Sequence, residues 1–135
     1  MGISVVWDNP QQTTLLYTFE EPWGWEDFDE ALRRGYQMME NTQQKVGVII
    51  DLSRVGSLPR NAIKHLSSGS QYQHPNQNTT VYVGMSPFVR AIFNILVNIM
   101  PRPLYDIHSV ETLKQARTLM NRQPWIRGLL RRINH

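Results

Sequence analysis

One short apolar run limits the fold of this chain more than any other feature. Residues 45–52 read KVGVIIDL, which is almost continuously apolar. A strand of this kind is typical of a parallel sheet that helices cover on both faces, because a strand with one wet face would alternate polar and apolar residues. The run therefore favours an α/β domain.

The segments before this run have strand, turn and helix character in that order. ISVVW at 3–7 and TTLLYTF at 13–19 are rich in β-branched and aromatic residues, and the turn-forming DNPQQ separates them. These segments predict an N-terminal β-hairpin. The stretch 25–39 then has helical spacing, with one apolar face made of Phe28, Ala31, Leu32, Gly35 and Met39.

The segments after the run continue the alternation. Helices are predicted within 58–70 and 86–100 and from 110 to 120, and strands are predicted at 79–85 and 102–108. The order is then ββαβαβαβα, a hairpin followed by βα units. This order predicts a mixed, mostly parallel sheet with right-handed crossovers and about four helices. The expected N-caps of the three later helices are Ser57, Ser86 and Ser109, with Pro87 in the first turn after Ser86.

The most specific pattern lies where the apolar run enters the second helix, in VIIDLSRVGSL at 48–58. It resembles the SpoIIAA-like or STAS-like domain family, whose corresponding strand reads hydrophobic-hydrophobic-Asp-Leu-Ser-x-Val, then an apolar residue, then Asp-Ser-Ser-Gly. LYDIHSVETLKQARTLM at 104–120 is similar to the last strand and helix of that family. The resemblance implies a SpoIIAA-like domain over 3–121, followed by a basic amphipathic C-terminal extension over 122–135. The matching positions of the first motif are Asp51, Leu52, Ser53, Val55 and Leu58.

One departure from the family concerns its switch. Anti-sigma-factor antagonists of the family are phosphorylated within Asp-Ser-Ser-Gly, but PRNA at 59–62, which includes Arg60, supplies no hydroxyl there. The kinase-controlled switch is therefore predicted to be absent. Of the nearby serines, Ser53 is interpreted as closing a turn and Ser57 as a helix cap, with phosphorylation of either ranked lower. Asp51 serves either the amides of the following loop or catalysis, and the first role is the commoner one.

Several other classes of protein lack support in the sequence. The chain has no cysteine, which excludes disulfides, thiolate nucleophiles and cysteine metal sites. It has no glycine-rich phosphate motif, and Asp51 alone does not make the acidic set of a receiver domain. We expect no catalytic residue, metal site or cofactor, and an enzyme that pairs Asp51 with a histidine is the minority hypothesis. No zinc-binding spacing connects the four histidines, His65, His74, His108 and His135.

Charge is distributed unevenly along the chain. Residues 1–44 hold eight acidic and two basic side chains, whereas residues 45–135 hold three acidic and twelve basic ones. A basic C-terminal part can attract anions, but its arginines lack interleaved aromatic residues beyond Trp125, so a nucleic-acid partner is not expected. The N-terminus lacks a signal-peptide pattern and no apolar segment is long enough to span a bilayer, so we expect a soluble cytoplasmic protein.

The helix predicted at 88–100 is unusually apolar. Ten of the thirteen residues of FVRAIFNILVNIM are apolar, and the polar ones follow a single narrow stripe. A helix on one face of a sheet needs an apolar stripe only about 100° wide. The remaining apolar surface predicts a further covering, from another helix, a second subunit or an apolar ligand. The candidate contacts are Phe88, Ile92, Phe93, Leu96 and Met100.

The C-terminal extension is one candidate for that covering. Apolar residues lie on one side of a predicted helix there, at Trp125, Ile126, Leu129, Leu130 and Ile133. Packing within the chain and dimerisation have similar weight, and contact of the extension with a membrane surface ranks third.

The sequence therefore predicts a non-enzymatic interaction or regulatory module that forms a homodimer and binds a protein partner of unknown identity. The alternative function is binding of a lipid or other apolar small molecule between the third helix and the sheet. The resemblance allows this alternative because STAS-like folds are similar in shape to lipid-binding SEC14-type domains.

Overall fold

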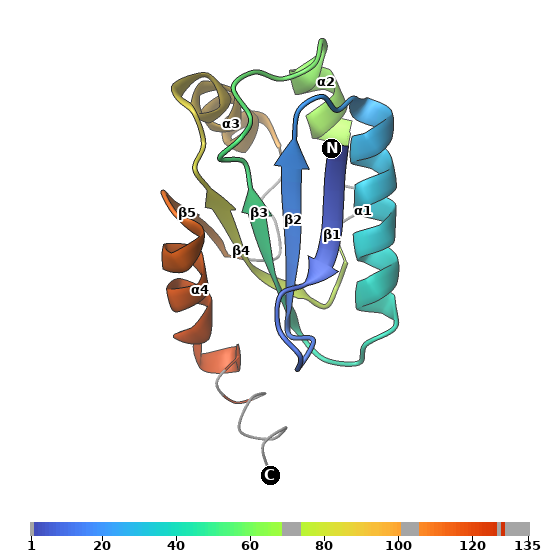
Figure 1. The fold of residues 1–135 in the computed structure, drawn as a ribbon, viewed down its shortest axis with the longest axis vertical. Coiled ribbons are helices and arrows are strands. Elements are labelled where there is room, and N and C mark those ends of the chain that lie inside the picture. The colour runs from blue at the N-terminus through green and yellow to red at the C-terminus, as the bar shows by residue number, and fades with distance from the viewer. Residues whose placement is uncertain (1, 69–73, 101–105, 127, 129–135) are drawn as a thin grey trace.

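The computed structural model describes residues 2–68, 74–100, 106–126 and 128, and within them the chain forms one five-stranded sheet, four helices of seven or more residues and a further helical turn at 124–126 (Figure 1). Of the last predicted strand, residues 102–105 lie outside the described residues. The strands are β1 (Gly2–Trp7), β2 (Thr14–Glu20), β3 (Val46–Asp51), β4 (Gln77–Val83) and β5 (Ile107–Val110). The helices are α1 (Trp25–Glu40), α2 (Ala62–Ser68), α3 (Pro87–Ile99) and α4 (Leu113–Asn121).

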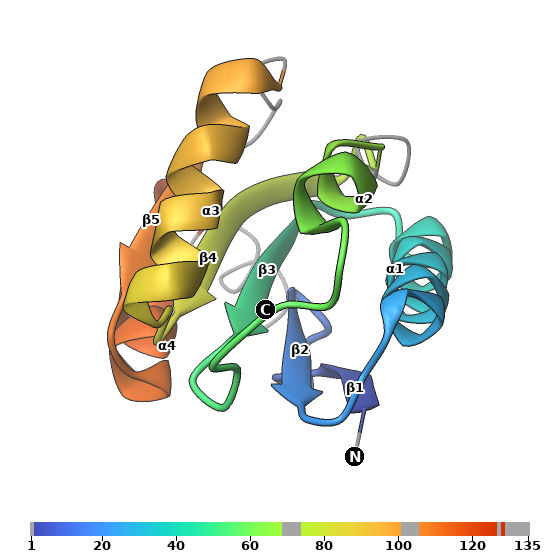
Figure 2. The same ribbon diagram turned by 90° about the horizontal axis from the view of Figure 1, so that it is seen from above.

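The strands lie in the sheet in the order in which they occur in the chain, β1-β2-β3-β4-β5. β1 and β2 are antiparallel, and every later neighbour is parallel. The predicted hairpin and the mixed, mostly parallel sheet are therefore confirmed. Because the order advances in one direction, right-handed crossovers place α1, α2 and α3 on the same face, and α4 covers the other (Figure 2).

The sheet has an apolar cluster on each face. Val48 of β3 belongs to the cluster beneath α1 and α3, which includes Ala31 and Val89. Ile49, the next residue, belongs to the cluster beneath α4, which includes Met120. Burial on both faces explains why the apolar run at 45–52 does not alternate.

Helix α1 approaches the sheet closely at Gly35. A Cβ atom at this position would overlap the Tyr17 hydroxyl and lie 2.7 Å from Tyr17 Cζ. Only glycine allows this approach without displacing the ring. Burial of the phenol raises the pKa of Tyr17 well above its ordinary value.

Of the caps predicted for α3 and α4, one is confirmed and the other is wrong. Ser86 caps α3 as predicted, since its hydroxyl accepts a hydrogen bond from the Val89 N–H at 3.2 Å. The prediction that Ser109 caps the last helix is wrong, because β5 continues through this residue. Thr112 caps α4 instead, and accepts from the Gln115 N–H at 3.1 Å within a capping box.

The start of α2 also differs from the expectation. Ser57 was expected to cap this helix, but the helix begins at Ala62 and Ser57 is exposed in the preceding loop. Asn61 has a φ of 63° immediately before the helix, a left-handed conformation that asparagine tolerates better than most residues. This turn redirects the chain, so the helix starts later than Pro59 suggests.

The first residues of the C-terminal extension pack on the domain. Ile126 is fully buried in the cluster beneath α4, and Trp125 Nε1 donates to Thr79 Oγ1 at 2.9 Å. These two residues lie on the face opposite α3, so the idea that they cover the apolar helix is wrong. Leu129, Leu130 and Ile133 lie outside the described residues.

Candidate functional site

A shallow groove of about 600 Å³ separates α2 from α3. The two helices are neighbours because both belong to crossovers on the same face of the sheet (Figure 2). The loop before α2 and the first turn of α2 form one wall, and the first half of α3 forms the other. The lining residues are Leu58, Pro59, Arg60, Asn61, Ala62, Ile63, Lys64, Phe88 and Ile92.

An exposed apolar stripe on α3 continues from this groove. Phe88 is 52% exposed, Ile95 is 44% exposed and Ile99 is 58% exposed. These residues and Ile92 follow the spacing i, i+4, i+7, i+11, which places them on one side of a helix. We call Ile63, Phe88, Ile92, Ile95 and Ile99 the α2–α3 apolar surface.

The five contacts proposed from the sequence divide between two sides of α3. Phe88 and Ile92 line the groove. Leu96 is only 8% exposed, Met100 is half-buried, and Phe93 packs against the core cluster beneath α3. Leu96 and Phe93 are therefore occupied by packing within the chain.

Sequence reasoning missed Ile95 and Ile99. The signal that could have found them is their own spacing from Phe88, at i+7 and i+11. The proposed set instead followed the spacing through Phe93 and Leu96, and nothing in the sequence alone says which side of an almost wholly apolar helix faces the sheet.

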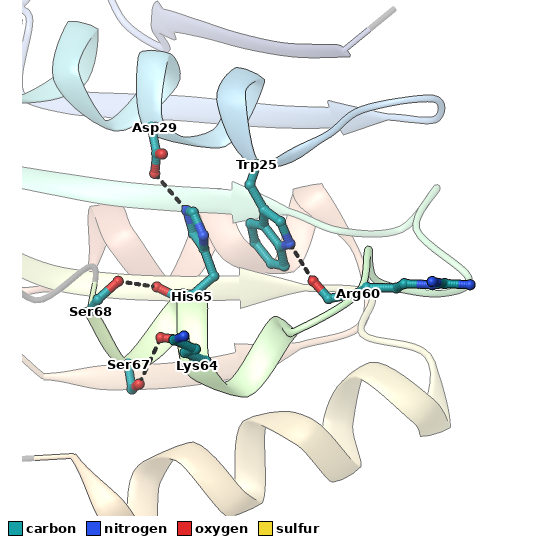
Figure 3. Close-up of polar contacts among 7 residues, drawn as sticks. All are labelled: Trp25, Asp29, Arg60, Lys64, His65, Ser67 and Ser68. Carbon is teal, nitrogen blue, oxygen red and sulfur yellow. Dashed lines mark hydrogen bonds and ion pairs between the residues drawn. The ribbon is translucent and has the colours of Figure 1, made fainter.

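Side chains of α1 hold α2 in place. None of the residues of α2 is buried. Trp25 Nε1 donates to the Arg60 carbonyl at 2.6 Å, and the Trp25 ring stacks on His65 with centroids 4.5 Å apart and planes 15° apart. His65 Nε2 lies 2.9 Å from Asp29 Oδ1 (Figure 3). The wall of the groove formed by α2 is thus fixed by contacts with Trp25 and Asp29 of α1 rather than by deep burial.

The two serines at the end of α2 satisfy carbonyls of its last turn. Ser67 Oγ donates to the Lys64 carbonyl at 3.0 Å, and Ser68 Oγ donates to the His65 carbonyl at 2.7 Å (Figure 3). Serine hydroxyls in helices commonly bond back to a carbonyl of the preceding turn, so both hydroxyls have a local partner within α2.

The groove carries positive charge. Arg60 and Lys64 line it, and within the described part of the chain neither side chain forms an ion pair. Figure 3 shows the Arg60 side chain extending away from Trp25. Arg54, by contrast, pairs with Glu20 at 2.9 Å. The sequence holds no Asp or Glu between positions 52 and 105, a stretch that includes both α2 and α3.

The family-like motif after β3 forms a tight turn. Asp51 Oδ1 accepts hydrogen bonds from the Ser53 N–H at 3.0 Å and from Ser53 Oγ at 2.7 Å. Gly84 approaches from the end of β4 with a φ of 68°, and a Cβ there would lie 2.9 Å from Ser53 Cα. Asp51 and Ser53 therefore have the turn-forming roles expected of them.

The histidines do not join Asp51 in the described part of the chain. The carboxylate that faces His65 belongs to Asp29, and the one that faces His74 Nε2, at 3.3 Å, belongs to Glu40. Among these residues no group of three or more His, Asp or Glu side chains is arranged to hold a metal ion. None of the helices in the described residues is both long and apolar enough to cross a membrane.

The space between α3 and the sheet contains side chains. Val89 is 5% exposed within the core cluster, and Phe93 packs edge-to-face on Tyr82 with centroids 4.9 Å apart. The groove described above lies beside α3, between this helix and α2.

The fold is similar to that of a solved structure. No family model matches the chain, and no curated protein matches it by sequence. A structure described as an anti-sigma-factor antagonist (STAS) domain protein from Planctomyces limnophilus matches with a TM-score of 0.58 and 15% sequence identity. The match covers 87% of this chain and 97% of that one. The expected SpoIIAA-like or STAS-like fold is therefore confirmed, at the level of fold alone.

Proposed function

We propose that the chain is a non-enzymatic, STAS-like interaction module that binds another protein through the α2–α3 apolar surface. The observation that carries the proposal is the exposure of Phe88, Ile95 and Ile99 on one side of α3, next to a groove. A contiguous patch of exposed apolar residues commonly marks an interaction site, whereas apolar residues scattered singly over a surface do not.

The size of the surface limits what it can do alone. Complete burial of an Ile or Phe side chain stabilises by about 1.5–3 kcal/mol, and these side chains are already about half-buried, so each has about 1 kcal/mol left to contribute. Association costs at least about 4 kcal/mol in lost freedom of motion. The apolar residues therefore need polar contacts around them to give a stable complex.

The structural neighbour supports this proposal. It is described as an anti-sigma-factor antagonist domain, a description that implies binding to another protein. In our chain PRNA at 59–62 lacks the hydroxyl that the family phosphorylates, and the Arg60 carbonyl is held by Trp25. We infer that binding is not controlled by phosphorylation at these positions.

Self-association is one form of the proposal, with a second copy as the bound protein. Light scattering after gel filtration tests it. A homodimer through α3 predicts that wild type has twice the monomer mass and that Ile95→Glu has the monomer mass. Val6→Glu is the matched control, because Val6 is 48% exposed but lies on β1. A wild-type monomer at micromolar concentration would remove the homodimer.

Binding of a lipid or other apolar small molecule remains the alternative function. The apolar lining of the groove supports it, whereas the side chains of Val89 and Phe93 beneath α3 count against a closed pocket there. Native mass spectrometry of the purified protein tests it, since a retained ligand adds a defined mass.

A further inference from the structure

The apolar surface and its charges together indicate what kind of protein binds there. Building on the proposed function, we propose that the α2–α3 apolar surface binds an acidic amphipathic helix of a partner protein rather than a second copy of this chain. The groove between two helices supplies the shape, and the cations at its edge supply the charge.

The shape of the site suits a third helix. Ile63 on one wall and Phe88 and Ile92 on the other line the groove, and Ile95 and Ile99 extend the apolar stripe along α3. An amphipathic helix places apolar side chains at i, i+3, i+4 and i+7 into grooves of this kind. Its opposite face stays in water.

The charge of the site selects the polar residues of that helix. Arg60 and Lys64 share the groove with the apolar residues, and neither forms an ion pair within the described part of the chain. Carboxylates beside the apolar stripe of a partner helix would pair with both cations. Such pairs supply the polar contacts that the apolar surface needs, and they speed association.

The same charges disfavour a second copy. In a two-fold dimer each surface meets an identical surface. If the two-fold axis ran through the groove, Arg60 and Lys64 of one copy would meet Arg60 and Lys64 of the other. No acidic residue between positions 52 and 105 is available to separate them. Like charges that meet at an interface cost binding energy, so the face is better matched to an acidic partner.

Two fluorescently labelled synthetic peptides test the inference with the 135-residue chain. Both are amphipathic helices of about 18 residues with the same leucine face, and their polar faces carry glutamate in one and lysine in the other. Fluorescence anisotropy at low salt measures their affinities. We expect the acidic peptide to bind at least about tenfold more tightly, and this preference to shrink as salt is added.

Charge-reversed variants locate the effect. The double variant R60E/K64E should abolish or invert the preference for the acidic peptide. The matched control K114E/R122E changes the net charge equally on exposed residues at α4, on the other face of the sheet, and should keep the preference. Ile95→Glu should also weaken binding of the acidic peptide, because the substitution removes an apolar contact and adds a negative charge to the surface.

The outcomes separate this inference from the proposed function. If wild type binds both peptides equally and Ile95→Glu binds neither, the proposal of an acidic partner is overturned but the proposed interaction surface is supported. A wild-type dimer that Ile95→Glu dissociates would identify a second copy as the occupant and overturn the inference. Binding to vesicles of anionic phosphatidylglycerol, with neither peptide bound, would assign the surface to a membrane. Absence of all these interactions would overturn both proposals.

Discussion

Ile95 and Leu96 are consecutive residues of α3 in different environments, and they provide a direct test of the exposed surface. Ile95 is 44% exposed, whereas Leu96 is 8% exposed. Truncation of a buried leucine to alanine costs about 2–5 kcal/mol, from the lost apolar contact and the cavity that remains. We therefore expect Leu96→Ala to lower the free energy of unfolding by about 3 kcal/mol.

The cost at Ile95 should be much smaller. About half of its side chain is already in water, so truncation removes about 1 kcal/mol of apolar burial. Alanine also has a higher helix propensity than isoleucine and returns about 0.4 kcal/mol. The expected net loss of unfolding free energy for Ile95→Ala is about 0.5 kcal/mol.

Urea unfolding followed by tryptophan fluorescence measures both losses, provided the dependence on urea is the same in both variants. Each variant is unfolded at two protein concentrations, because stability gained from dimerisation depends on concentration. A large loss for Ile95→Ala only at the higher concentration would indicate a second copy on α3. Equal losses for the two variants at every concentration would mean that the chain itself covers Ile95, and the proposed surface would not exist.

Three further predictions concern the way the helices are held. Gly35→Ala should lower the free energy of unfolding by about 2 kcal/mol, because the new methyl group displaces the Tyr17 ring, and the loss should be smaller in the Tyr17→Phe background; urea unfolding of the double-mutant cycle measures this coupling. The raised pKa of Tyr17 means that the unfolded chain loses this proton first, so the free energy of unfolding should fall as pH rises above about 10, and fall less in Tyr17→Phe; equal slopes in the two proteins would contradict this. Trp25→Phe removes the donor to the Arg60 carbonyl and should lower the free energy of unfolding by about 1 kcal/mol in the same assay. If the folded variant also binds the acidic peptide more weakly, the indole positions the groove as well.

The elements of the fold were largely predictable from the sequence because their signals are local. The apolar run at 45–52, the hairpin and the cap at Ser86 each depend on residues close together in the chain. The cap at Ser109 was wrong because a strand can extend through a serine, and the register of β5 is set by its pairing with β4. The prediction that Ser57 caps α2 was wrong because the left-handed turn at Asn61 is not apparent from composition.

The candidate site was only partly predictable because it depends on contacts between distant segments. The sequence indicated that the helix at 88–100 has too much apolar surface for one sheet face. Two of the contacts it proposed, Phe88 and Ile92, line the groove. It could not show that Trp25 stacks on His65, since these side chains come from different helices. The charge of the groove was likewise not predictable, because it depends on the packing that brings Arg60 and Lys64 beside α3.

The way α2 is held bears on how the site works. One wall of the groove belongs to α3, whose Val89 is anchored in the core, but the other belongs to a helix of seven residues with none buried. That helix is positioned by Trp25 and Asp29 of α1. A bound helix would therefore meet one rigid wall and one wall whose position costs little to change, since contacts of this kind are each worth about 1 kcal/mol. We expect partner affinity to respond to substitutions in α1 that never touch the partner, and to do so through the position of Arg60 and Lys64.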